Sequence, residues 1–147
     1  MQIISEVMTR DVRSIAPQEN VRRAAQMMEE MDVGAVPVCE GSKLTGMITD
    51  RDIVIRTIAK GEQPENVRVE QIMSTSVRTC FDDQPVDEVL EQMADSQIRR
   101  VPVLDHNTHQ MVGIVSLGDL AQERAAGIDQ ALSQVSQSSS SQQPAAS

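Results

Sequence analysis

The chain contains one short pattern twice, as GMITDRDI at residues 46–53 and as GIVSLGDL at residues 113–120. In each version a glycine and apolar residues of strand type precede a hydroxyl residue, and a carboxylate follows three positions after the hydroxyl. Thr49 and Asp52 occupy these two positions in the first version, and Ser116 and Asp119 occupy them in the second. A hydroxyl three residues before an acid, ahead of an apolar run, is typical of a helix cap. Each stretch therefore predicts a strand that ends where a helix begins.

The similarity extends well beyond these two stretches. Met8 recurs as Met73, and the triplet Val36-Pro37-Val38 recurs as Val101-Pro102-Val103, both at an offset of 65 residues. From Gly46 onward the offset is 67, so the second copy carries two extra residues. An insertion of this kind marks a loop. The chain is therefore built from two copies of one unit.

Within each copy, the spacing of apolar residues changes from helical to strand-like in the same order. Apolar residues recur at helical spacing in residues 20–31 and 85–95. In each copy two short β-rich runs then flank a polar turn, at residues 35–39 and 44–49 in the first copy and at 100–104 and 111–116 in the second. A further helix is predicted for residues 50–59 and from 117 onward. The predicted fold class is α/β (α+β), with two tandem β-α-β-β-α repeats. Because a unit of roughly 50 residues buries little surface alone, we expect the repeats to pack sheet against sheet with pseudo-twofold symmetry, around one shared core and with a cleft between them.

The predicted domain boundaries follow from this pattern and from composition. We place the first repeat at residues 5–59, a linker at 60–71 and the second repeat at 72–126. Residues 133–147 consist largely of Ser and Gln and have no aliphatic period. Such a composition does not offset the entropy of ordering, so we predict a disordered tail.

Composition excludes several classes of function. The 13 Lys+Arg and 22 Asp+Glu residues give a net charge of −9, which opposes binding to nucleic acid. No apolar run approaches the length of about 18 residues that a membrane span needs, and no secretory signal is present, so we expect a cytoplasmic protein without membrane contact. Cys39 and Cys80 are expected to be reduced, buried hydrophobes. With one Phe and no Trp or Tyr, the core must be aliphatic.

Taken together, these features resemble a tandem pair of CBS domains, the cystathionine β-synthase-type regulatory domain. The resemblance covers about residues 5–124 and rests on the openings at residues 7–9 and 72–74, the two Val-Pro-Val runs and the doubled Gly-x-x-[Ser/Thr]-x-x-Asp pattern. It is strongest to small stand-alone bacterial CBS-pair proteins of the hypoxic-response-protein type. The resemblance implies an adenosine-type ligand in the cleft: AMP, ADP or ATP, with NAD and S-adenosylmethionine as further candidates. It also implies a homodimer formed through the helices, with Met-rich and aliphatic faces buried between chains.

Physical reasoning assigns roles to individual residues in such a cleft. Carboxylates accept from ribose hydroxyls, and hydroxyls with free N–H groups at a helix start hold phosphate. We therefore expect Asp52 and Asp119 to contact ribose, and Thr49 and Ser116 to contact phosphate. The aliphatic walls for the base are expected to be Val12, Val77, Val36 and Val101. The strand backbone that reads the base edge is expected at Ala35, Pro37, Arg100 and Pro102. The cations that compensate the charge are expected to be Arg51, Arg99 and Arg100.

Two of these assignments have a simpler alternative. The hydroxyl and carboxylate pairs could be helix caps alone. Arg99-Arg100 replaces Gly34-Ala35 of the first copy and could be a solvated pair opposite an acidic helix. Leu117-Gly118 likewise replaces Asp50-Arg51. The two clefts therefore cannot be chemically equivalent.

Three functions are compatible with these residues to different degrees. The first is a regulatory module that senses an adenosine ligand and signals by conformational change, and the second is a dimerisation or protein-interaction module with vestigial clefts. An enzyme has the least support, because no nucleophile and base stand together in the motifs. No metal site is expected, since the two histidines of residues 105–109 lack helical i, i+4 spacing.

Overall fold

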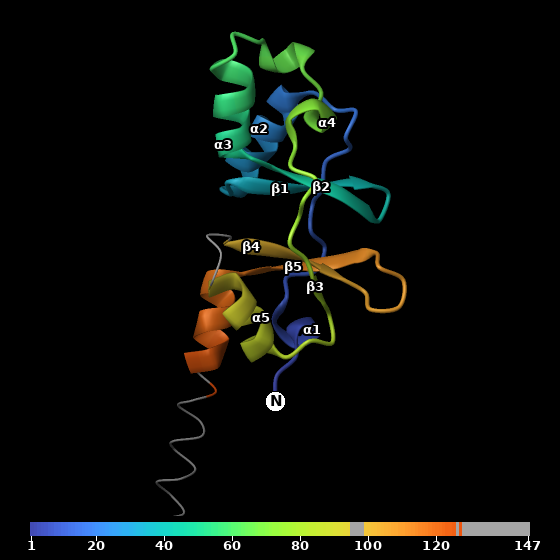
Figure 1. Cartoon of the computed structure of the whole chain (residues 1–147), viewed down its shortest axis with the longest axis vertical. Coiled ribbons are helices and arrows are strands. Elements are labelled where there is room, and N and C mark those ends of the chain that lie inside the picture. Colours follow the sequence, from blue (N-terminus) through green and yellow to red (C-terminus); the bar gives the residue numbers. More distant parts are fainter. Residues whose placement is uncertain (95–98, 126, 128–147) are drawn as a thin grey trace, which may run out of the picture.

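The two repeats form two stacked halves whose hairpins face each other, with helices on the outer sides of both (Figure 1). The computed structural model describes residues 1–94, 99–125 and 127. One half holds the two-stranded sheet β1-β2, and the other holds the three-stranded sheet β3-β4-β5. The predicted tail, residues 133–147, lies outside the described residues.

The first half follows the predicted order of elements. Helix α2 (Val21–Met31) begins after Asn20, whose side chain accepts a hydrogen bond of 2.9 Å from the backbone N–H of Arg23. Strand β1 (Ala35–Glu40) pairs antiparallel with β2 (Lys43–Thr49). Helix α3 (Asp50–Ile53) follows at once and continues as the π-helix η1 (Val54–Ile58), and a short 3-10 turn, η2, spans Pro64–Asn66.

The second half repeats these elements. Helix α5 (Val86–Ala94) precedes β4 (Arg100–Leu104), which pairs antiparallel with β5 (Met111–Ser116), and residues 117–125 are helical. The predicted first strand is short: β3 (Cys80–Phe81) runs parallel to β4. Its counterpart in the first half is a single parallel bridge between Ile15 and Val38.

Two further helices, which the sequence pattern did not predict, exchange between the halves. The opening helix α1 (Ile4–Val7) belongs to the first repeat by sequence, but Ile4 is fully buried in the core of the second half and its N–H donates to the carbonyl of Gln84 at 2.9 Å. Helix α4 (Val69–Ile72) opens the second repeat, but Val69 and Ile72 pack in the core of the first half. Each repeat thus completes the core of the other.

The aliphatic residues form two separate cores, which corrects the prediction of one shared core. The first lies between β1-β2 and helices α2 and α4, and the second lies between the β3-β4-β5 sheet, α1, α5 and the helix at 117–125. The reason is that each sheet already has helices covering its outer face, so its branched side chains point there. Val67 and Val69 of the predicted linker, residues 60–71, lie in the first core.

Gly46 and Gly113 allow each sheet to touch, backbone to backbone, the exchanged opening segment that packs on it. Ile114 exchanges two hydrogen bonds with Thr9, at 2.9 and 3.0 Å, and Met47 does the same with Ser74, at 2.9 and 2.8 Å. A Cβ added to Gly113 would lie 2.8 Å from the carbonyl oxygen of Thr9, and one added to Gly46 would lie 2.7 Å from that of Ser74. The glycine at the start of each repeated pattern therefore makes room for the opening segment of the other repeat.

Candidate functional site

The repeated patterns bring the predicted polar residues together at the ends of β2 and β5. Ala35 lies opposite Thr49 in the β1-β2 register, and Arg100 lies opposite Ser116 in the β4-β5 register. Asp52 and Asp119 follow three residues later, in the first turn of the next helix. Each half therefore presents a strand end, a hydroxyl and a carboxylate as one group.

In the first half, the carboxylate and the hydroxyl are bound to each other's backbone. Asp52 Oδ2 accepts a hydrogen bond of 3.0 Å from the N–H of Thr49, and Thr49 Oγ1 accepts one of 3.1 Å from the N–H of Asp52. The Asp52 side chain is only 11% exposed, and its Oδ1 lies 3.9 Å from Nε of Arg56. This is a complete capping box. The simpler alternative of a helix cap thus describes the contacts of the first motif.

In the second half, only one of the two capping contacts is present. Ser116 Oγ accepts a hydrogen bond of 3.1 Å from the N–H of Asp119. The Asp119 residue is exposed, and its carboxylate makes no hydrogen bond or ion pair with any residue that the structure describes. This carboxylate is therefore open to solvent or to a ligand.

The side chains beside the two motifs differ although the backbone contact is the same. Asp50 N–H donates to the carbonyl of Gly34 at 2.9 Å, and Leu117 N–H donates to that of Arg99 at 2.7 Å. In the first half the Asp50 carboxylate lies over Gly34, where an added Cβ would be 3.1 Å from Oδ2, and Oδ1 accepts from the N–H of Arg51.

The second half has cations at this place. Arg99 is exposed and Arg100 is half-buried. Neither guanidinium forms an ion pair with another residue in the described part of the chain. The second motif is thus bordered by two positive charges, whereas the first is bordered by the Asp50 carboxylate.

Two of the predicted apolar walls do not face a cleft. Val36 is fully buried and Val101 is 2% exposed, and each belongs to the core of its own half. Their side chains are therefore not available to a base, which corrects that assignment. The physical reason is strand alternation: the valines point to the helices, so the adjacent Pro37 and Pro102 point to the opposite face. Val12 and Val77 are half-buried and stay candidates.

A cavity of about 180 Å³ lies where the two halves meet and includes one predicted residue, Val77. Its remaining lining residues were not predicted: Leu44, Thr45, Thr75, Thr79, Leu104 and His109. A repeat signal exists for one of them, because Thr79 corresponds to Ser14 at the offset of 65. A second, more open depression of about 480 Å³ lies between residues 16–20 and 65–68 and includes no predicted site residue.

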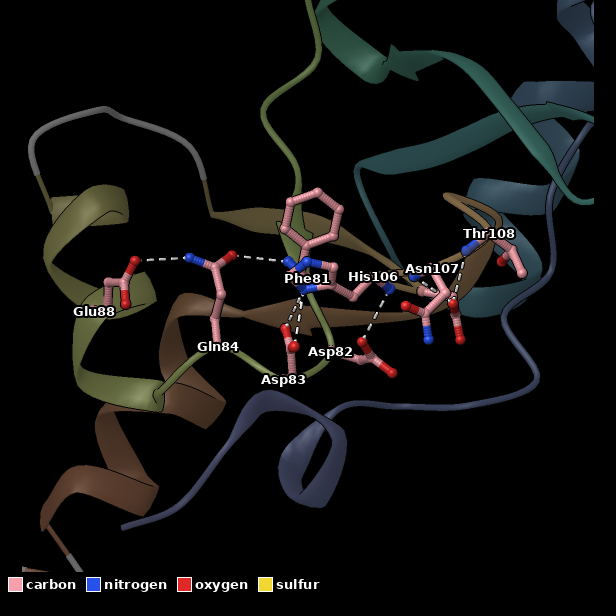
Figure 2. Close-up of polar contacts among 9 residues, drawn as sticks. Phe81, Asp82, Asp83, Gln84, Glu88, His106, Asn107 and Thr108 are labelled. Atoms are coloured by element: carbon pink, nitrogen blue, oxygen red, sulfur yellow. Dashed lines mark hydrogen bonds and ion pairs between the residues drawn. The ribbon is translucent and has the colours of Figure 1, made fainter.

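The hairpin turn that contains both histidines is held by structural contacts (Figure 2). Asp105 Oδ1 accepts from the N–H groups of Asn107 and Thr108, at 2.8 and 2.9 Å. His106 Nδ1 lies 2.8 Å from Asp83 Oδ2, and this hydrogen-bonded carboxylate raises the pKa of His106 above its ordinary value of 6.5. Among the described residues, no group of three or more His, Cys, Asp or Glu side chains could hold a metal ion.

The two cysteines are buried free thiols. Burial raises the pKa of Cys80 to about 12, with a further contribution from the charge of Asp82. Burial also raises the pKa of Cys39. Both side chains are therefore protonated at neutral pH, which leaves no thiolate nucleophile at either position.

Comparison with known proteins places this geometry in a family. The model of the CBS domain matches residues 4–57 and again residues 69–126. The chain therefore belongs to the CBS domain family and carries two copies of the domain, as the doubled motif predicted. The predicted α+β fold of two repeats is confirmed as well.

Relatives and solved structures of similar length support the same assignment. The CBS domain-containing protein YhcV of Bacillus subtilis is 40% identical over 121 residues, which cover 82% of this chain and 84% of YhcV. A crystal structure of Hypoxic Response Protein I with two coordinated zinc ions is similar with a TM-score of 0.73 and 35% identity, covering 84% of this chain and 99% of that one.

One similar structure contains adenosine compounds. The CBS domain pair of protein MJ0100, in complex with 5-methylthioadenosine and S-adenosyl-L-methionine, matches with a TM-score of 0.73 and 26% identity. The match covers 86% of this chain and 98% of that one. No helix among the described residues is long and apolar enough to cross a bilayer.

Proposed function

We propose that this chain is a regulatory module that binds an adenosine compound in the cleft between its two CBS repeats and signals by a conformational change. The observation that carries the proposal is the exposed Asp119 carboxylate, which has no partner among the residues that the structure describes. It lies one helical turn from Ser116, which is opposite Arg100 in the strand register, and Arg99 precedes Arg100. A carboxylate is the acceptor that a ribose diol needs, and arginines are the donors that phosphate needs. The MJ0100 pair, which binds 5-methylthioadenosine and S-adenosyl-L-methionine, supports this ligand class.

Each part of the ligand has a proposed contact. Asp119 accepts from the ribose hydroxyls, Ser116 and the N–H groups at the start of the helix face the phosphate, and Arg99 and Arg100 offset its charge. Val77 contacts the base from the half-buried segment between the two halves. AMP, ADP, ATP, NAD and S-adenosylmethionine all carry the required ribose, so the ligand within this class is decided by experiment.

A thermal-shift panel of these five compounds tests the proposal. A ligand that binds only the folded state at 100 times its dissociation constant adds about 2.7 kcal/mol of stability, which raises the melting temperature measurably. Inorganic phosphate at the same concentration is the control, because it carries the charge without the nucleoside. No shift with any of the five compounds at millimolar concentration would contradict the proposal.

We infer a homodimer as the second functional feature. Val54, Ile55 and Ile58 of the π-helix η1 are 54%, 46% and 54% exposed, and we refer to them as the aliphatic surface. The expected Met-rich contact needs revision, because Met27 and Met28 are only 4% and 7% exposed and lie in the core. This aliphatic surface also favours the alternative of a protein-interaction module with vestigial clefts.

The remaining expectations follow from the same proposal. The predicted absence of catalysis agrees with the regulatory role of stand-alone CBS pairs, and a regulated partner protein is part of the proposed signalling. A cytoplasmic location and the lack of nucleic-acid binding stay predictions from composition.

A further inference from the structure

The two repeats use the same carboxylate position in different ways. In the first repeat, both groups that a nucleotide needs are engaged inside the chain: the Asp52 carboxylate holds the N–H of Thr49, and the Thr49 hydroxyl holds the N–H of Asp52. In the second repeat, Ser116 makes the corresponding contact with a backbone N–H, but Asp119 does not return it. A ligand at the first position therefore meets a carboxylate and a hydroxyl that already hold backbone N–H groups, whereas at the second position Asp119 holds none in the part of the chain that the structure describes.

The residue one turn further along the helix strengthens this difference. Arg56 Nε lies 3.9 Å from Asp52, and Arg56 Nη1 donates at 2.9 Å to the carbonyl of Ile72, which fixes the side chain in place. The corresponding residue in the second repeat, at the offset of 67, is Glu123, and it accepts a hydrogen bond from Gln2 at 3.1 Å. The charge of Asp52 is thus compensated inside the chain, whereas Asp119 has another acid at i+4.

The charges at the strand ends complete the contrast. Asp50 adds a second carboxylate beside Asp52, and it lies over Gly34, where the chain enters β1. In the second repeat these two positions are Leu117 and Arg99, and Arg100 follows. At the strand end itself, an anionic group therefore meets the Asp50 carboxylate in the first repeat and Arg99 and Arg100 in the second.

From these contacts we propose that the clefts have divided roles: the second binds the adenosine ligand, at one ligand per chain, and the first motif is a structural cap that holds β2 against α3. This inference rests on the proposed function, because it assigns that function to one of the two clefts. It also predicts that the two aspartates differ in the unliganded protein, because the Asp52 carboxylate has contacts to lose and that of Asp119 has none with the described residues.

Titration calorimetry on the full chain, combined with melting curves of the unliganded protein, tests the division. The probes are AMP, ATP and S-adenosylmethionine, and the variants are Asp119→Asn and Asp52→Asn. Glu91→Gln is the matched control, because it removes one exposed carboxylate from helix α5.

The inference expects the wild type to bind one ligand per chain. Asp119→Asn weakens binding by about 10- to 100-fold, as loss of a charged hydrogen-bond partner does, with the melting temperature of the unliganded protein unchanged. Asp52→Asn lowers that melting temperature, while the number of ligands stays at one per chain. Glu91→Gln changes neither quantity.

Three results separate failure of the inference from failure of the proposed function. Two equivalent ligands per chain overturn the inference and leave the proposed function intact. If Asp52→Asn and Asp119→Asn lower the melting temperature of the unliganded protein equally, the inference is also overturned, whether or not the protein binds a ligand. Absence of heat from all three probes on the wild type, together with no thermal shift from the five-compound panel, overturns the proposed function and, with it, the assignment of a ligand to the second cleft.

Discussion

Gly113 lies where the backbone of β5 passes directly against the opening segment of the chain. An added Cβ would be 2.7 Å from Met8 Sδ and 2.8 Å from the carbonyl oxygen of Thr9. The methionine side chain can move, but the carbonyl is held because Thr9 and Ile114 exchange two hydrogen bonds. The close approach thus depends on the missing side chain rather than on an unusual backbone conformation.

Gly113→Ala is therefore expected to destabilise the protein. Forcing a methyl group into a filled contact costs about 1 to 3 kcal/mol, which urea unfolding can measure. Gly118→Ala is the control, because residue 118 is helical and no described atom beyond its own helix backbone and chain neighbours lies within 4 Å of its added Cβ. That variant should gain about 0.5 to 1 kcal/mol from helix propensity. Equal stability of the two variants would contradict the close-contact explanation.

At the scale of elements, the hairpin turn between β4 and β5 links three parts of the molecule. Phe81, the single aromatic residue with a six-membered ring, lies with its ring 4.8 Å from that of His106 and 5.4 Å from that of His109. His106 also contacts Asp83 before α5, as Figure 2 shows. On the other side, Met111 N–H donates to the carbonyl of Ser42 in the first hairpin turn at 2.9 Å.

This turn should make stability depend on pH. Asp83 raises the pKa of His106 in the folded protein, so the pair stabilises the fold fully below the ordinary pKa of 6.5. The contribution is lost as the pH rises through the raised pKa. His106→Asn should therefore lower the melting temperature more at pH 5.5 than at pH 8.5. Asp83→Asn should show the same dependence, and a deficit that is independent of pH in both variants would exclude the ion pair as its cause.

The sequence predicted those elements whose signals are local. The hairpins, α2 and α5 have apolar periods and caps within their own residues, and all are present as predicted. Helices α1 and α4 are four residues each, too short for a period, and they form because Ile4 and Val69 are buried by the opposite half. The π-helix η1 likewise has no local signal that separates it from an α-helix.

The site was predicted in part for the same reason. The hydroxyl and carboxylate spacing is visible in the sequence, but whether a carboxylate is free depends on contacts that spacing cannot show. Asp52 and Asp119 occupy equivalent positions, and only the structure distinguishes the capped side chain from the exposed one. Alternation shows that Val36 and Pro37 face opposite ways but not which face is the core.

At the scale of the whole molecule, the aliphatic surface of Val54, Ile55 and Ile58 lies on η1, which continues helix α3, one of the outer helices of the first half (Figure 1). Monomeric proteins rarely leave contiguous apolar patches of this kind uncovered. The same patch on a second copy is self-complementary in a twofold dimer. The proposed homodimer would cover it.

Light scattering coupled to size-exclusion chromatography tests the dimer. The wild type is expected to have the mass of two chains, and Ile55→Glu/Ile58→Glu the mass of one, because buried unpaired carboxylates oppose association. Gln110→Glu, an exposed residue of the hairpin turn, is the control and should stay dimeric. A wild type with the mass of one chain, or a dimer that persists in the double variant, would rule out this surface as the contact.

The exchange of α1 and α4 means that the unit repeated in the sequence is not the unit that packs. In a chain with a single repeat, the core would lack one helix, because the opening helix of each repeat packs in the core of the other half. Two such chains could complete their cores by exchanging their opening helices, as in domain swapping. When two repeats are joined in one chain, the same exchange of helices takes place within that chain. Duplication of a swapped dimer by gene fusion therefore gives this architecture without any change in its contacts.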